Sequence, residues 1–223
     1  MQIVGAGSPG SFGDEDAARL AQWEAAWALR QPPRNEVPAA APVEALLAST
    51  ESMAVYICGA CVYRNGMGFS IQVLSRYGDE DTDDLTDPLW GNGGSPRLLV
   101  GIQFADGRRC SNLRADTGLE PHGKDEPYLH DEGGGGDAHR SSMELFLTPL
   151  PPSGDLTIIC AWPDKDIPET TTRLPTDDIR AAANRVHQLW PDAPTQHTAR
   201  APKPPHVPEG GWFAAQLDEP PTQ

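Results

Sequence analysis

The alternation of apolar and polar positions predicts short β-strands through the middle of the chain. In residues 143–147 every second side chain is apolar, and residues 156–162 repeat this pattern after a Pro-rich turn. A third segment, residues 169–174, contains three β-branched threonines, which favour strands. Because an apolar sheet face needs a second layer to cover it, we expect further strands upstream.

Two hairpins and an edge strand upstream supply that second layer. The clearest turn is Asn65-Gly66, a pair typical of tight hairpins, and Asp106-Gly107 marks another. With the downstream strands, the count is about seven to eight strands with local antiparallel connections. The predicted fold class is therefore all-β, an antiparallel β-sandwich. The upstream segments are residues 43–47, 53–63, 67–75, 98–104 and 108–113.

Helical patterns flank the predicted strands on both sides. Residues 14–29 place Leu20, Trp23 and Trp27 at helical spacing, which predicts an N-terminal helical extension followed by a Pro-rich linker. After the last strand, Thr176 is a suitable N-cap for a C-terminal α-helix whose apolar stripe runs to Trp190. We expect that helix to cover an open face or edge of the sheet.

These patterns divide the chain into three parts. Residues 1–42 are the helix and linker, residues 43–191 are the sandwich domain, and residues 192–223 are a Pro-rich tail predicted to be disordered. Within the tail, the apolar segment at Trp212-Phe213 is either a docking element or a short partner motif; the sequence does not decide between them.

Composition excludes several classes of partner. The formal net charge is -15, from 17 Lys+Arg against 32 Asp+Glu, so nucleic-acid and anionic-membrane binding are not expected. No apolar run approaches the ~18 residues of a membrane span, and the N-terminus lacks a signal-peptide pattern. Four cysteines do not make a disulfide framework in a chain of 223 residues. We therefore expect a cytoplasmic protein with reduced thiols.

Acidic residues concentrate in two segments between predicted strands. Residues 77–96 hold six carboxylates, and residues 115–139 hold seven against Lys124 alone. If every connection reverses strand direction, both segments emerge at one end of the sandwich. This acidic loop end is either a set of solvated loops or a site for cations or a basic protein.

The second acidic segment also contains the candidate metal ligands. Imidazole and carboxylate groups bind divalent metals, and the candidates are His122, His130, Asp131 and His139. Their spacing matches no helical ligand motif, and the glycine run at residues 133–136 predicts a mobile loop. A metal-dependent enzyme that uses the loop 122–139 is the alternative function.

Three motif matches lack the structure that their chemistry needs. The GxGxxG letters at residues 5–10 and the Cys58-x5-Arg64 spacing lack the flanking strand and helix of a dinucleotide or phosphatase loop. Cys58 and Cys61 form a CxxC, but residues three apart in a regular strand face opposite sides. We expect these thiols to be buried and to behave as small apolar residues.

One combination of segments resembles an uncharacterised, β-rich family of proteins from high-GC bacteria. The resemblance covers residues 43–191, ends in an Ala-rich helix, and implies domain limits but no activity. The segments that carry it are Pro96-Arg97-Leu98, Phe104-Ala105-Asp106-Gly107-Arg108, the glycine run 133–136, Leu150-Pro151-Pro152, Gly154, Trp162-Pro163 and Ile167-Pro168-Glu169-Thr170.

The sequence leaves the biochemical activity unknown and favours a non-catalytic binding or protein-interaction module. Its contact surfaces would be the acidic loop end or the tryptophan-bearing extensions. Its partner would be a protein with a basic surface. No cofactor is expected.

Overall fold

The computed structural model describes residues 27–28, 30–77, 98–113 and 125–191. Within these ranges, eleven strands form three sheets in which every pairing is antiparallel. The predicted all-β class is confirmed. The N-terminal helix expected at residues 14–29 lies outside the described residues apart from its last turn, and so does the tail 192–223.

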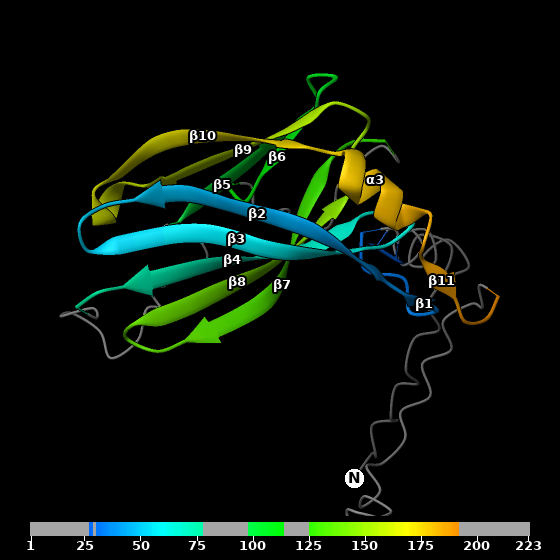
Figure 1. The fold of residues 1–223 in the computed structure, drawn as a ribbon, viewed down its shortest axis with the longest axis horizontal. Helices are drawn as coiled ribbons and strands as arrows, with labels where there is room; N and C mark the ends of the chain where they lie inside the picture. The colour runs from blue at the N-terminus through cyan, green and yellow to red at the C-terminus, as the bar shows by residue number, and fades with distance from the viewer. Residues whose placement is uncertain (1–26, 29, 78–97, 114–124, 192–223) are drawn as a thin grey trace, which may run out of the picture. The chain divides into compact units, whose positions relative to one another are not determined.

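The larger sheet has five strands and carries the candidate site on its outer face (Figure 1). Tight hairpins join β2 to β3, β3 to β4 and β7 to β8, whereas the β4–β8 pairing joins segments far apart in sequence. In spatial order the strands are β2 (Ala39–Ser49), β3 (Met53–Val62), β4 (Met67–Ser75), β8 (Arg140–Thr148) and β7 (Tyr128–Gly136).

The second sheet has four strands, and a two-stranded clasp joins segments near the two ends of the domain. The clasp pairs β1 (Glu36–Val37) with β11 (His187–Gln188). Helical segments are the 3-10 turn η1 (Pro163–Lys165) and α3 (Asp177–Ala183). In spatial order the four strands are β10 (Ile167–Pro175), β9 (Asp155–Trp162), β5 (Leu99–Gln103) and β6 (Arg109–Ser111).

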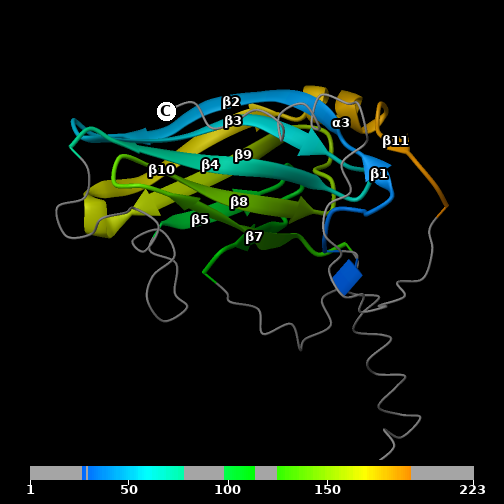
Figure 2. The same ribbon diagram turned by 90° about the horizontal axis from the view of Figure 1, so that it is seen from below.

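One hydrophobic core lies between the two larger sheets, which form facing layers (Figures 1 and 2). Ile57 and Ile71 enter it from the five-stranded sheet, and Ile158 and Trp162 enter it from the four-stranded sheet. Full burial of such side chains stabilises the fold by ~1.5–3 kcal/mol each. The predicted hairpins and their turns are present as expected.

The C-terminal helix is shorter than its apolar stripe predicts. Helix α3 buries Ile179, but it ends at Ala183, and the chain then extends into β11. Leu189 and Trp190, expected to extend the stripe, are 46% and 56% exposed. Without a face to pack against, these residues gain little from helix formation. Their backbone bonds to Asn35 instead: the amide of Leu189 donates to the carbonyl of Asn35 at 2.8 Å, and the side-chain amide of Asn35 donates to the carbonyl of Trp190 at 2.9 Å.

Two stretches expected to be irregular are strands. The strand predicted for residues 43–47 begins at Ala39 and follows the β1 strand, so ordered structure starts inside the predicted linker. Pro42 fits there because it lies at a register shift on an edge strand. The predicted mobile loop contains β7, and Asp137 Oδ1 closes the β7–β8 turn by accepting from the amides of His139 and Arg140 (2.8 and 2.9 Å). No helix in the described ranges is long and apolar enough to cross a membrane.

Candidate functional site

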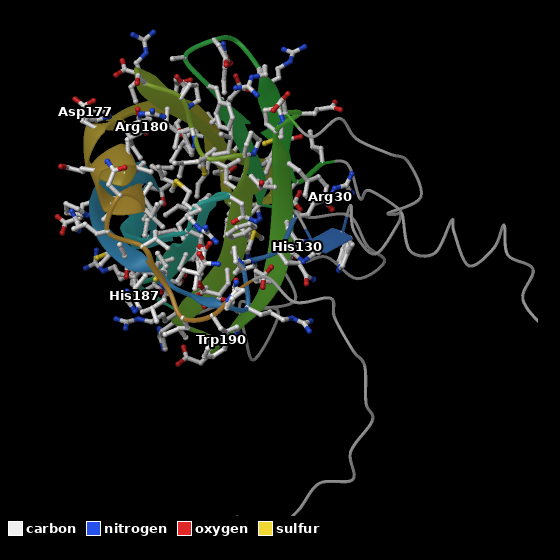
Figure 3. All side chains as sticks on the ribbon, turned by 90° about the vertical axis from the view of Figure 1, so that its right-hand side faces the viewer. Arg30, His130, Asp177, Arg180, His187 and Trp190 are labelled. Carbon is white, nitrogen blue, oxygen red and sulfur yellow. The ribbon has the colours of Figure 1, made fainter. Side chains whose placement is uncertain are left out.

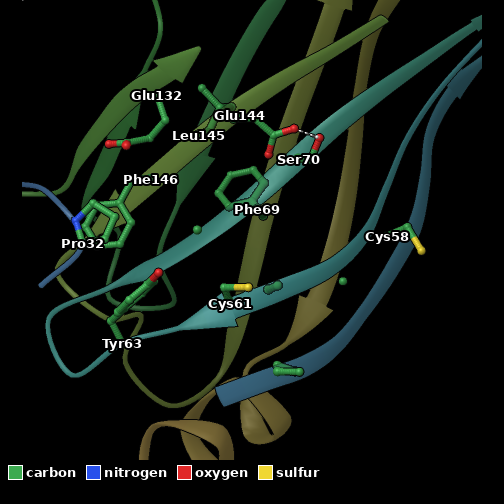
Figure 4. A pocket seen from close by; sticks show the side chains of 15 residues that line it. Pro32, Cys58, Cys61, Tyr63, Phe69, Ser70, Glu132, Glu144, Leu145 and Phe146 are labelled. Atoms are coloured by element: carbon green, nitrogen blue, oxygen red, sulfur yellow. Dashed lines mark hydrogen bonds between the residues drawn. The ribbon is translucent and has the colours of Figure 1, made fainter. Parts of the chain in front are cut away.

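The outer face of the five-stranded sheet contains a hollow of about 450 Å³ (Figure 4). Side chains that point away from the core on β3, β4, β7 and β8 line it, and Pro32 contributes to one wall. Ala40, Gly59 and Gly68 are small, so the backbone is close to the surface over much of the floor. The hollow exists because small residues occupy positions where neighbouring strands carry large ones.

Pro32 belongs to residues 30–37, which we call the strap. Arg30 is only 7% exposed, and its guanidinium lies 4.5 Å from the centre of the Tyr128 ring, a cation–π contact. The side-chain amide nitrogen (Nδ2) of Asn65 donates to the backbone carbonyl of Gln31 at 3.0 Å. Figure 3 shows Arg30 and His130 on the same side of the molecule. The strap is thus held against β7 and the β3–β4 turn.

Phe146 anchors the hollow from the outer face of β8. Leu145 and Leu147 enter the main core, so Phe146 between them lies on the opposite face of β8. Its side chain is nevertheless 0% exposed. The Tyr63 ring packs edge-on against it, with 5.8 Å between ring centroids. Gly66 is required beside it, because a Cβ there would lie 2.3 Å from the carbonyl oxygen of Leu147 and 2.9 Å from the Phe146 ring. A small second apolar cluster therefore stiffens one end of the hollow.

A β-bulge brings both cysteines of the CxxC to the hollow. The β3–β4 register shifts between Ile57 and Ala60, and Gly59 has φ +82°, which glycine adopts readily. The extra residue puts Cys58 and Cys61 on the same, outward face, and both are exposed. The prediction that they are buried was wrong, because it assumed a regular strand. Figure 4 shows the two side chains at separate positions along β3.

The other two thiols behave as predicted for buried cysteines. Burial raises the pKa of Cys110 to about 12 and that of Cys160 to about 11. Both stay protonated at neutral pH, so they are poor nucleophiles and poor metal ligands.

Two carboxylates project into the hollow from adjacent strands. Glu144 Oε1 accepts from the Ser70 hydroxyl at 2.7 Å, and Gln72 Nε2 donates to the same hydroxyl at 2.6 Å. Glu132 precedes Gly133, which pairs with Glu144, and its Oε1 lies 3.4 Å from His130 Nε2. Among the described residues that line the hollow there is no lysine, arginine or histidine. The charged side chains among those lining residues are therefore both acidic.

The hydroxyl of Tyr63 completes the polar groups at this end. Its pKa is raised, mainly by burial and then by the nearby charges of Cys61, Glu132 and Glu36. Because a raised pKa favours the neutral phenol, Tyr63 keeps its proton at neutral pH and remains a hydrogen-bond donor.

The structure does not gather the candidate metal ligands that it describes. His130 lies on β7, and Asp131, its neighbour along the strand, points to the other face. His139 lies beyond the far end of β7, with Nδ1 3.3 Å from the carbonyl of Ser75. The parts of the chain that the structure describes hold no group of three or more metal-ligating side chains. His122 lies outside them, so a metal site completed by that residue stays a prediction.

Aromatic packing occupies His130 instead. Its ring centroid is 5.0 Å from that of Trp27, edge-on, and 6.1 Å from that of Tyr128, stacked. Desolvation raises the pKa of the Asp131 carboxyl despite an amide hydrogen bond from Gly133. Neither geometry is that of a ligand pair directed at one ion.

Most of the predicted acidic loop end also lies outside the described residues, whereas the hollow was not predicted at all. Its sequence signals are weak but present: Gly59 inside an apolar run marks a bulge, and Phe146 is an apolar residue on the face that alternation assigns to solvent.

Comparison with protein-family models, with curated proteins and with solved structures finds no match to the chain. The resemblance to a β-rich bacterial family therefore stays a prediction.

Proposed function

We propose that the chain is a non-catalytic binding module whose hollow receives part of a partner protein with a basic surface. The observation that carries this proposal is the combination of a small-residue floor with the carboxylates of Glu132 and Glu144, and with no basic side chain among the described residues that line the hollow. A cationic, partly apolar segment is complementary to both features at once.

The framework around the hollow supports the proposal. Binding to a pre-organised site has a smaller entropic cost, because fewer side chains must be ordered. Here the Ser70–Gln72 hydrogen bonds orient Glu144, and Phe146 and the strap hold the opposite end.

Two facing sheets, with α3 packed against β2, support an antiparallel sandwich that is closed by its C-terminal helix. The four free thiols support a reducing compartment such as the cytoplasm as its location.

The test fills the hollow without disturbing the sheet. A Cβ added at Gly68 would have its nearest neighbours at 3.9 Å, and the backbone there has no positive φ, so Gly68→Val is tolerated and its side chain occupies the floor. Gly135→Val is the matched control, because a Cβ there meets nothing within 4 Å and Gly135 does not line the hollow.

The probes are synthetic pentapeptides, Ac-Ala-Leu-Lys-Leu-Ala-NH2 and its counterparts with arginine or glutamate in the central place. In backbone-amide NMR spectra, we expect the basic peptides to shift resonances of β3, β4 and β8 and the glutamate peptide to shift none. Gly68→Val should abolish these shifts, and Gly135→Val should leave them unchanged. Basic peptides that bind Gly68→Val as tightly as the parent protein, or that bind neither protein, would refute the proposal.

A further inference from the structure

We propose that residues 14–26 of the chain itself dock in the hollow, with Leu20 and Trp23 packed over its floor, and that they compete there with the partner. The docking stands on its own observations, whereas the competition rests on the proposed function.

Trp27 brings the N-terminal segment to the edge of the hollow. Its ring lies edge-on against His130, with 5.0 Å between ring centroids, and His130 Nε2 lies 3.4 Å from Oε1 of Glu132, which lines the hollow. Trp27 is helical, and its carbonyl accepts from the amide of Arg30 at 3.0 Å. The residues before Trp27 therefore start from a helical turn that is fixed beside the hollow.

A row of paired residues crosses the sheet from this contact to the floor of the hollow. His130 pairs with Phe146 on β8, Phe146 with Gly68 on β4, and Gly68 with Cys61 on β3. Directly paired residues project to the same face, so the row lies on the outer face, and its last three members line the hollow. Neighbouring strands are about 4.8 Å apart, which places Phe146 about 5 Å and Gly68 about 10 Å from His130.

The apolar stripe of the predicted N-terminal helix has a matching spacing. A helix rises about 1.5 Å per residue, so Trp23 and Leu20 lie about 6 and 10 Å from Trp27 along its axis, on the same face. A helix that continues from Trp27 across the row thus brings Trp23 over the Phe146 ring. Leu20 then lies over Gly68, which has no side chain to obstruct it. This contact removes apolar surface of both the helix and the hollow from water.

The segment also shares the chemical character of the proposed partner. Arg19 is the one basic residue among residues 1–26, and it precedes Leu20 at the edge of the apolar stripe. The segment is therefore basic and apolar at the position that would meet the hollow. Because it is tethered to the domain, its effective concentration at the hollow is high, and a free partner must displace it.

The first measurement detects the docking in the full chain. Trp23→Ala and Leu20→Ala should each shift the backbone-amide NMR resonances of Gly68 and Phe146, because each removes a side chain packed over them. Gln22→Ala is the matched control, since in a helix Gln22 faces away from the stripe, and it should shift neither resonance.

The second measurement is the dissociation constant of the lysine pentapeptide, obtained by NMR titration of the same variants. Docking reduces the apparent affinity by the fraction of molecules whose hollow is open. We expect Trp23→Ala to tighten peptide binding by about tenfold, as for a segment docked in about nine-tenths of the molecules, and Gln22→Ala to change it by less than about twofold.

The two measurements separate the docking from the proposed function. Unchanged Gly68 and Phe146 resonances in both stripe variants would overturn the docking, and the peptide titrations would then decide the proposed function alone. Shifted resonances with an unchanged peptide affinity would overturn the competition. Shifted resonances with no peptide binding by any variant would support the docking and overturn the proposed function.

Discussion

The buried ion pair between Glu36 and Arg64 gives the sharpest test of how the strap is attached. The Glu36 side chain is 1% exposed, whereas that of Arg64 is 49% exposed. Glu36 Oε1 accepts from Nε of Arg64, and its Oε2 accepts from the Arg64 backbone amide at 3.1 Å. Arg64→Ala removes the guanidinium and keeps the amide, so a buried carboxylate loses half of its partners.

The expected cost follows from those contacts. Removing one partner of a fully buried ion pair costs about 3–5 kcal/mol. The retained amide and the half-exposed arginine reduce this, so we expect Arg64→Ala to lower the free energy of unfolding by about 2 kcal/mol. Urea unfolding at pH 7, followed by tryptophan fluorescence, measures the change as a lower midpoint at an unchanged slope.

The control is Arg173→Ala, which removes an exposed arginine from β10. We expect it to change stability by less than about 0.5 kcal/mol. A double-mutant cycle with Glu36→Gln isolates the pair, and its coupling energy should be about 1 kcal/mol or more. If Arg64→Ala costs no more than Arg173→Ala, the strap is not held by this pair and the reasoning fails.

Three further predictions test the remaining parts of the site. Phe146→Ala should lower the free energy of unfolding by about 3–5 kcal/mol in the same urea assay, because it empties a fully buried position. Gly136→Ala should cost about 1–3 kcal/mol, since the new Cβ would lie 2.2 Å from the backbone oxygen of Arg140; a neutral result would show that the β7–β8 turn is open. Ellman's reagent at pH 7 should modify two thiols rapidly in the folded protein and all four in denaturant, because burial raises the pKa values of Cys110 and Cys160 to about 12 and 11; rapid reaction of more than two would contradict that burial.

The strands that follow simple alternation were predictable from the sequence. In β4 and β9 every second residue is buried, so the pattern that predicts each strand also states which face enters the core. The Asn65-Gly66 and Asp106-Gly107 turns were predictable for the same reason, because turn chemistry is local.

Elements that depend on distant partners were not predictable in this way. Four glycines in β7 carry no side-chain pattern, and only pairing with β8 makes them a strand. The β1–β11 clasp joins two-residue segments 150 residues apart, which no local window contains. The helical stripe through Trp190 failed for the same reason, since the clasp competes with the helix for that backbone.

The proposed site lies where the strands depart from alternation. In β8 the outward positions beside the core residues are Glu144 and Phe146, one a charge and the other a fully buried aromatic ring. In β3 the departure is the bulge at Gly59, which turns the alternating pattern over and exposes Cys61. A sheet face covered only by water usually presents polar side chains, and Phe146 departs from this because neighbouring side chains on that face bury its ring. These departures come together on one face and around one hollow, and this is the physical reason for assigning binding to the outer face of the five-stranded sheet.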